Sequence, residues 1–257
     1  MSFFNFENQQ IFYSVQGEGE PLLLLHGNSV SSKMFRYEIE YFSQNYKVIV
    51  FDYPGHGESD RLDEFRDDFW HYNAQCALKL LSLLDVKLCK VIGTSGGALI
   101  GLNLAILEPN IISKLVVDSF LGETLNIEVA KDIVRKRTIA KTSGFMEQQF
   151  WKFMHGEDWE QVVDNDLRLM LKVAEKKLPL IWGDLSSIKS DVLGIASTED
   201  ELIPNIDERL ISICRKIPNC YTKIFNYGKH PFMITQKQEF RKLVKDFFEN
   251  NIKYEIL

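Results

Sequence analysis

The sequence predicts an α/β fold in which a mostly parallel sheet carries helices on both faces and a helical cap insertion. Short apolar runs alternate with longer stretches of helical periodicity along most of the 257 residues. Several short runs are apolar throughout, as expected for strands that are buried on both faces. Between residues 121 and 185 the strand pattern stops, and helical periodicity, many charges and a group of aromatic residues remain. We therefore expect a core of residues 1–120 and 186–257, and a cap, or lid, of residues 121–185.

The first part of the core contains most of the expected sheet. Strands are predicted at residues 3–6, 11–15, 22–25, 47–51 and 89–92, and the first two form a hairpin. Ser31 or Ser32 is expected to cap a helix that buries Phe35, Ile39 and Phe42. A longer helix carries an apolar stripe between residues 70 and 84, and residues 96–107 are apolar on nearly every side. The latter pattern is typical of a buried helix.

Further strands are expected directly before and after the cap. A buried strand at residues 115–117 ends at Asp118, and strands follow the cap at residues 192–197 and 221–225. A helix with Ile206, Leu210 and Ile213 on one face lies between these two strands, and an amphipathic helix ends the pattern. In such a sheet, functional residues are expected on loops at the carboxyl ends of the strands.

Composition excludes several classes of partner. The formal charge of −6 argues against nucleic acid or an anionic membrane surface, since both select basic clusters. No apolar run is long enough to cross a bilayer. The first residues lack a basic and apolar signal pattern, and Cys76 and Cys89 have the setting of buried thiols, so we expect a cytoplasmic protein. The four cysteines show no metal or redox spacing, and the oligomeric state is left open.

The segment Gly93-Thr94-Ser95-Gly96-Gly97 stands between a buried strand and a buried helix. This G-x-S-x-G pattern in strand–turn–helix context is the nucleophile elbow, in which the serine occupies a strained turn at the edge of the sheet. Gly93 and Gly97 are expected to let the strand and helix approach closely. The sequence therefore nominates Ser95 as a nucleophile.

Two further strand ends carry the groups that a serine nucleophile requires. A serine hydroxyl needs a base within hydrogen-bond reach, and the base needs a group that fixes its tautomer. His230 follows the strand at 221–225, and Asp200 follows the strand at 192–197, in the order Ser, Asp, His. Asp118 also ends a strand and is the alternative acid. The backbone amides of Gly96 and Asn28 are the expected donors to the developing oxyanion.

These segments resemble the α/β-hydrolase superfamily, in its branch of small capped enzymes of the carboxylesterase and C–C hydrolase kind. The resemblance covers nearly the whole chain except the cap. Its matching segments are the apolar strand followed by His26-Gly27, the Asp52–Ser59 turn, Gly93–Gly97, Asp200 four residues before Pro204, and Gly228-Lys229-His230. Ser197 stands where the family often has glycine, and Asp191 stands where proline commonly precedes the strand.

The resemblance implies a serine hydrolase without a metal or organic cofactor. It would cleave a small, fairly apolar ester, thioester, lactone or activated amide through an acyl-Ser95 intermediate, as a carboxylesterase does. The same three residues in this family also serve C–C bond hydrolysis, elimination from a menaquinone-pathway intermediate and N-terminal aminopeptidase activity. A ligand-binding or sensing protein on the same scaffold is the non-enzymatic alternative.

Other polar residues have weaker assignments. The cap carboxylates are expected to form a solvated face, although one of them would suit the ammonium group of an amino-acid ester. His26 is expected to pack behind the loop that contains Asn28, and His56 belongs to the Asp52–Ser59 turn. We assign His71 and His155 to the surface or to the cap.

Overall fold

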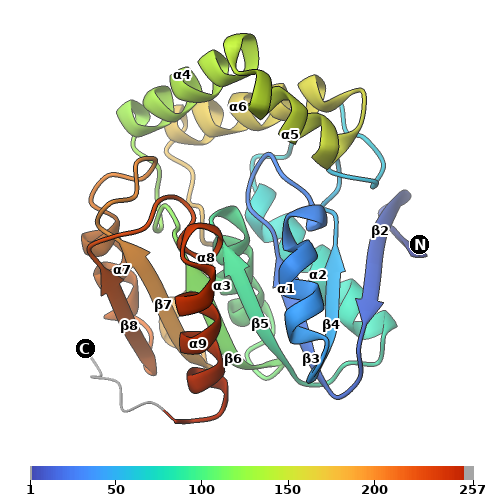
Figure 1. The fold of residues 1–257 in the computed structure, drawn as a ribbon, viewed down its shortest axis with the longest axis vertical. Helices are drawn as coiled ribbons and strands as arrows, with labels where there is room; N and C mark the ends of the chain where they lie inside the picture. Colours follow the sequence, from blue (N-terminus) through green and yellow to red (C-terminus); the bar gives the residue numbers. More distant parts are fainter. Residues whose placement is uncertain (1, 252–257) are drawn as a thin grey trace.

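The computed structural model describes residues 2–251 and contains one eight-stranded sheet (Figure 1). The strand order is β1-β2-β4-β3-β5-β6-β7-β8. The pairs β1–β2 and β2–β4 are antiparallel, and every other pair of neighbouring strands is parallel. The strands are β1 (Ser2–Phe6), β2 (Gln9–Gln16), β3 (Glu20–Leu25), β4 (Tyr46–Phe51), β5 (Cys89–Thr94), β6 (Ile112–Asp118), β7 (Asp191–Ser197) and β8 (Cys220–Phe225). This topology confirms the predicted α/β fold.

Helices cover both faces of the sheet because the central strands are apolar on both sides. Leu22 and Leu24 of β3 pack with α1 (Arg36–Phe42) and α9 (Lys237–Phe248) on one face. Leu23 and Leu25 pack on the opposite face, with α2 (Phe69–Leu83), α3 (Gly96–Leu107) and α7 (Ile206–Cys214). Figure 1 shows α1 and α9 in front of the sheet and α3 behind it. The alternation of side chains along each strand therefore fills two apolar layers.

Three helices form a separate layer above one edge of the sheet. They are α4 (Ile127–Ser143), α5 (Phe145–His155) and α6 (Trp159–Glu175), and Figure 1 shows them together over the carboxyl ends of the parallel strands. Thr124 and Pro179 form an isolated bridge at the base of this insertion. The helices fall within the predicted cap, and the boundaries at residues 121 and 185 stay a prediction.

Ion pairs and apolar contacts join the cap to the core. Arg61 pairs with Asp158 at 2.8 Å, and Asp67 pairs with Lys172 at 2.7 Å and with Lys176 at 2.8 Å. These pairs are partly exposed, so each contributes less than about 1 kcal/mol. The apolar face of α6 stabilises the contact more than these pairs do, because residues such as Val162, Met170 and Val173 are buried in the main core.

Two local features differ from the sequence-based expectations, and a third adds to them. The first helix begins as a 3-10 turn, η1 (Ser32–Phe35), and neither Ser31 nor Phe35 caps with its side chain. His155 lies in the cap, one of the two places expected for it, and it is buried there. Cys214 and Cys220 form a disulfide across the turn between α7 and β8, a pairing we did not predict. Cys76 and Cys89 are free and buried, as expected.

No helix in residues 2–251 combines the length and the hydropathy that a membrane span requires. The expected cytoplasmic location stays a prediction.

Candidate active site

Ser95 occupies a sharp turn between β5 and α3. Its backbone has φ 54° and ψ −120°, a conformation that non-glycine residues rarely adopt. The turn is possible because the neighbouring backbones come very close: a Cβ atom on Gly93 would collide with the backbone of Gly97, and one on Gly97 would collide with Leu25. Both glycines are therefore required by space, and the strand–turn–helix context expected for Ser95 is present.

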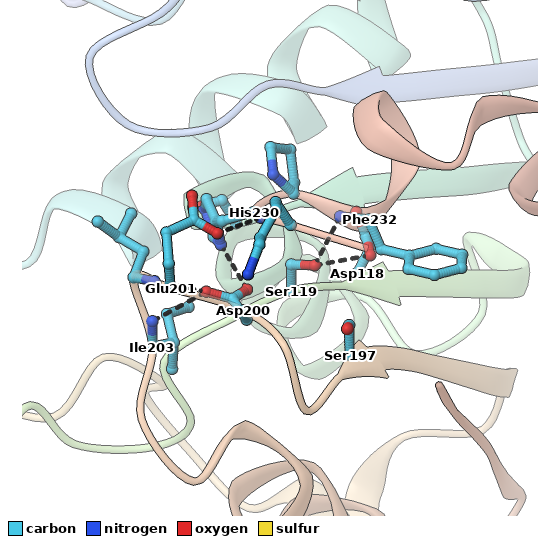
Figure 2. A network of polar contacts seen from close by, with 12 residues as sticks. Asp118, Ser119, Ser197, Asp200, Glu201, Ile203, His230 and Phe232 are labelled. Atoms are coloured by element: carbon cyan, nitrogen blue, oxygen red, sulfur yellow. Dashed lines mark hydrogen bonds and ion pairs between the residues drawn. The ribbon is translucent and has the colours of Figure 1, made fainter. Parts of the chain in front are cut away.

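His230 lies between Ser95 and Asp200. Its Nε2 atom is 3.1 Å from the Ser95 hydroxyl oxygen, and its Nδ1 atom is 2.7 Å from a carboxylate oxygen of Asp200. The side chain of Asp200 is 1% exposed and that of His230 is 9% exposed, so solvent hardly competes for their contact. The other carboxylate oxygen of Asp200 accepts from the amides of Leu202 and Ile203, each at 2.9 Å. Figure 2 shows this carboxylate facing the His230 ring.

Ser197 connects the loop of Asp200 to the loop of His230. Its hydroxyl lies 2.7 Å from the Tyr227 carbonyl and 2.8 Å from the Gly228 carbonyl, and it accepts from the Glu199 amide at 3.1 Å. A glycine at this position would lack these bonds. The departure from the family pattern at Ser197 therefore adds a link between the two loops.

Asp118 has a separate set of partners. It accepts from Thr94 and Ser119, both at 2.9 Å, and from the Met233 amide at 3.1 Å. Figure 2 shows Asp118 and Ser119 beside Phe232, apart from the Asp200 carboxylate. Complete burial raises the pKa of Asp118 to about 6. The structure thus places Asp200, and not the alternative acid, in contact with the His230 ring.

Two backbone amides beside Ser95 have no hydrogen-bond acceptor among residues 2–251. They belong to Gly96, the first residue of α3, and to Asn28, in the loop after β3. The position of a Cβ on Gly96 would lie only 3.1 Å from the Asn28 nitrogen, so the two amides are neighbours. Unpaired amides at a helix start favour an anion, as an oxyanion hole requires.

A buried ion pair of the cap contacts the loop that carries Asn28. Asp166 of α6 is fully buried; it accepts from the Asn28 side chain at 2.6 Å and from the Ser29 hydroxyl. Arg137 of α4 donates to Asp166 at 2.6 Å and to Ser29 at 2.9 Å. On its other side, the Asn28 side chain accepts from the Trp70 indole at 3.2 Å. The sequence contains no motif around Arg137 or Asp166, and we did not predict their place in the site.

Two cavities meet at Ser95. The larger has a volume of about 610 Å³ and is bordered by Asn28, Arg137 and His230, with a mostly apolar wall from η1, α5 and α8 (Phe232–Thr235). The smaller has a volume of about 20 Å³, roughly the space of one water molecule, and is lined by Gly96, Leu121 and Ile203 among others. Ser95, Asn28 and Arg137 border both cavities.

Aromatic residues of the cap contribute to packing and to the larger cavity, and Trp151 contributes to both. Trp151 and Trp159 stack with ring centroids 5.7 Å apart in a small apolar cluster. Phe150 and Phe153 are 45% and 56% exposed and border the larger cavity. No cap carboxylate lines either cavity among the described residues, so the expected match to an ammonium group is not present.

Three buried histidines lie behind the site. His26 donates from Nδ1 to the Gly27 carbonyl at 2.8 Å and accepts from the Tyr53 amide at 3.3 Å. His155 accepts from the Gly57 amide at 3.0 Å and lies 3.1 Å from the Ser29 carbonyl, so it joins α5 to both loops. Burial lowers the pKa of His26 well below its usual value and that of His56 and His155 to about 3. All three are therefore neutral near pH 7.

A serine, a histidine and a carboxylate in one hydrogen-bonded line, beside two unpaired amides, is the arrangement found in enzymes that use an activated serine. Within residues 2–251, no group of three His, Cys, Asp or Glu side chains is placed to hold a metal ion. A parallel sheet that carries such a line at the carboxyl ends of its strands, with the serine on a strand–turn–helix elbow, is typical of α/β hydrolases.

The chain belongs to the family described as "alpha/beta hydrolase fold", which it matches over residues 20–177. It is similar to the (E)-2-((N-methylformamido)methylene)succinate hydrolase of Acinetobacter baylyi, with 31% identity over 169 residues. That alignment covers 64% of this chain and 62% of the relative, which is less than two thirds of the relative's length.

Two further proteins match over nearly the full chain. The putative carbamate hydrolase RutD of Pseudomonas syringae pv. syringae is 23% identical, over 92% of this chain and 96% of its own length. The esterase EaEST from Exiguobacterium antarcticum has a similar structure, with a TM-score of 0.78, 18% identity, and coverage of 96% of this chain and 99% of that one. At this identity, the structural match supports the fold alone.

Proposed function

We propose that the protein is a serine hydrolase that cleaves a small ester, thioester, lactone or activated amide through an acyl-Ser95 intermediate. The observation that carries the proposal is the line of Ser95, His230 and Asp200 facing two unpaired backbone amides. A hydroxyl alone is a weak nucleophile at neutral pH, and this line supplies both the base and the group that orients it. No cofactor is needed for this chemistry.

In the first half of the proposed reaction, the Ser95 oxygen attacks the substrate carbonyl carbon while its proton passes to Nε2 of His230. Asp200 holds the opposite proton on Nδ1 and stabilises the imidazolium that forms. The carbonyl oxygen becomes an anion between the amides of Gly96 and Asn28. One such donor is typically worth about 3 kcal/mol in the transition state. The leaving group departs with the proton from His230 and leaves the acyl enzyme.

In the second half, a water molecule replaces the leaving group. His230 removes a proton from water, the hydroxide attacks the acyl carbon, and the same amides bind the new oxyanion. Collapse returns the proton to Ser95 and releases the acid. In each half His230 takes up one proton and then gives it up, to the leaving group in the first half and to Ser95 in the second, so the enzyme is unchanged after one turnover.

The two cavities support a substrate with one large and one small limb. The larger cavity, of about 610 Å³, has room for an extended acyl or alcohol group, whereas the smaller, of about 20 Å³, suits a group no larger than methyl. The names of the relatives, a succinate-derivative hydrolase and a putative carbamate hydrolase, also support a small acyl substrate.

The test is labelling of the purified protein with a fluorophosphonate probe, followed by mass spectrometry of the adduct. We expect labelling on Ser95, none in Ser95→Ala, and slow labelling in His230→Ala. Turnover of simple esters, and not of vinylogous diketones, would then favour ester cleavage over C–C hydrolysis. A folded protein that binds small esters but neither reacts with the probe nor turns them over would be a sensing protein, and the proposal would be wrong.

A further inference from the structure

The charged side chains that line the larger cavity are mainly positive, although the chain as a whole has a formal charge of −6. Four lysine and arginine side chains border it, and Glu38 is the one acidic side chain on its wall within the described residues. The four cations are Lys33, Arg36, Arg137 and Lys237. Such a local reversal of charge selects ligands of opposite sign.

Three of the five charges are compensated within the protein. Lys33 pairs with Glu58 at 2.7 Å, and Arg137 pairs with Asp166 at 2.6 Å. The buried carboxylate of Glu38 pairs with Arg241 at 2.7 Å, so it adds no net negative charge to the wall.

Arg36 and Lys237 have no carboxylate partner among residues 2–251. They begin the neighbouring helices α1 and α9 and flank the Tyr37 ring. The Lys237 Nζ atom is 4.5 Å from the ring centroid, and the Arg36 guanidinium carbon is 5.8 Å from it. Tyr37 is 57% exposed, which places these two charges where the cavity opens to solvent. The cavity therefore has a net positive opening and a mostly apolar wall that leads to Ser95.

We propose that the large limb of the substrate ends in a carboxylate, which Arg36 and Lys237 bind while the apolar wall holds the chain between this carboxylate and the scissile bond. The inference rests on the proposed function and specifies its substrate class as a half-ester of a dicarboxylic acid or an acyl ester of a hydroxy acid. Both cations are solvent-accessible, so the selectivity is modest and depends on salt.

The test uses neutral and anionic substrates of the same shape. The monomethyl esters of succinic to suberic acid place the carboxylate on the acyl limb, and acetyl esters of matching hydroxy acids place it on the alcohol limb. The control for each is the analogue with a terminal carboxamide. We expect KM for one anionic series to lie about two- to fivefold below that of its amide controls, with an optimum chain length. In about 1 M salt, where the Debye length is about 3 Å, the difference is expected to vanish.

Substitutions of Arg36 and Lys237 test whether these two cations cause the preference for anionic substrates. Arg36→Gln and Lys237→Gln are each expected to raise KM for the anionic substrates more than KM for the amide controls, so that the ratio of the two KM values moves toward one. Lys79→Gln makes the same charge change on the exposed side of α2, outside the cavity, and is the matched control. It is expected to behave as the wild type.

Two results would separate this inference from the proposed function. If neutral esters are hydrolysed through Ser95 but both anionic series have equal or higher KM than their amides, the carboxylate inference is wrong and the serine hydrolase stands. If the anionic preference is present but is unchanged in both variants, Arg36 and Lys237 do not bind the carboxylate. Absence of any Ser95-dependent turnover would instead overturn the proposed function.

Discussion

Asp200 and Asp118 are two carboxylates at the ends of neighbouring strands, and their hydrogen bonds separate their roles. Asp200 accepts two backbone amides on one oxygen and faces the His230 ring with the other. Asp118 accepts from two hydroxyls and one amide, and none of its hydrogen bonds is to His230. Because both strands end at the same edge, the sequence pattern alone left both residues open as the acid.

The first prediction follows from this difference. Asp200→Asn is expected to lower kcat by about four orders of magnitude, because an amide oxygen or nitrogen at this place no longer fixes the required His230 tautomer. Asp118→Asn is expected to change kcat by less than about tenfold, since Asp118 does not contact the ring. The measurement is steady-state hydrolysis of an activated ester, with circular dichroism to verify folding. A large loss of kcat in folded Asp118→Asn, together with a small loss in Asp200→Asn, would reverse the assignment.

Ser197 gives a second prediction at this scale. Ser197→Ala removes the link between the loops of Asp200 and His230 and leaves the Glu199 amide without its acceptor. We expect the free energy of unfolding to fall by about 1 kcal/mol and kcat to fall more than KM changes. Urea titration and ester kinetics on the same preparation measure both effects. Unchanged stability would mean that the hydroxyl bonds are replaced by water.

Individual residues of the site were predictable to the extent that local backbone geometry requires them. Ser95 with its flanking glycines, and His230 after the last strand, follow short patterns with a steric or chemical cause. Asp166 and Arg137 have no such pattern, since they meet Asn28 only through packing of the cap on the core. The site residues that were missed are therefore those that lie far in the sequence from the residues they contact.

Among the elements, α4 and α6 of the cap support the loop that carries one of the expected oxyanion donors. The Arg137–Asp166 pair joins the two helices, and Asp166 binds both Asn28 and Ser29. The helical character of the cap could be predicted from periodicity, but the placement of its helices could not, because helical periodicity does not specify which polar residues face the core.

The element-scale prediction concerns Asp166→Asn. It leaves the guanidinium of Arg137 without its buried partner and is expected to lower the free energy of unfolding by about 3 kcal/mol. It is also expected to lower kcat about tenfold or more, because the Asn28 amide is displaced and one oxyanion donor is worth about 3 kcal/mol when lost entirely. Denaturation and ester kinetics provide the two readouts.

The matched control for this prediction is the double variant Arg137→Met, Asp166→Leu. It removes both charges, so stability is expected to recover most of the loss. Because Leu cannot bind the Asn28 side chain, kcat is expected to stay low. If kcat recovers together with stability, the pair supports folding of the cap and does not position the Asn28 loop.

For the whole molecule, the parallel sheet and the two apolar layers were predictable because continuous and alternating hydrophobic patterns have direct structural causes. The burial of the histidines was harder to predict from the sequence. His155 is separated by about a hundred residues from the loops it contacts, and a lone histidine on a helix gives no sign of burial. Its position nevertheless links the stability of the cap–core contact to pH.

The last prediction is that acid destabilises the protein through its buried histidines. The folded-state pKa of His155 is lowered to about 3, whereas an unfolded histidine has a pKa of about 6.5, so below pH 6.5 the unfolded state binds the proton first. The stabilisation is therefore complete above pH 6.5 and falls as the pH drops toward 3. Between pH 7 and pH 5 each such histidine lowers the free energy of unfolding by about 2 kcal/mol.

His155→Gln tests this prediction, because glutamine keeps an acceptor for the Gly57 amide and a donor for the Ser29 carbonyl but cannot titrate. Urea unfolding of both proteins at the two pH values is expected to show a decrease about 2 kcal/mol smaller in the variant. Equal decreases would mean that His155 is accessible to protons in the folded protein.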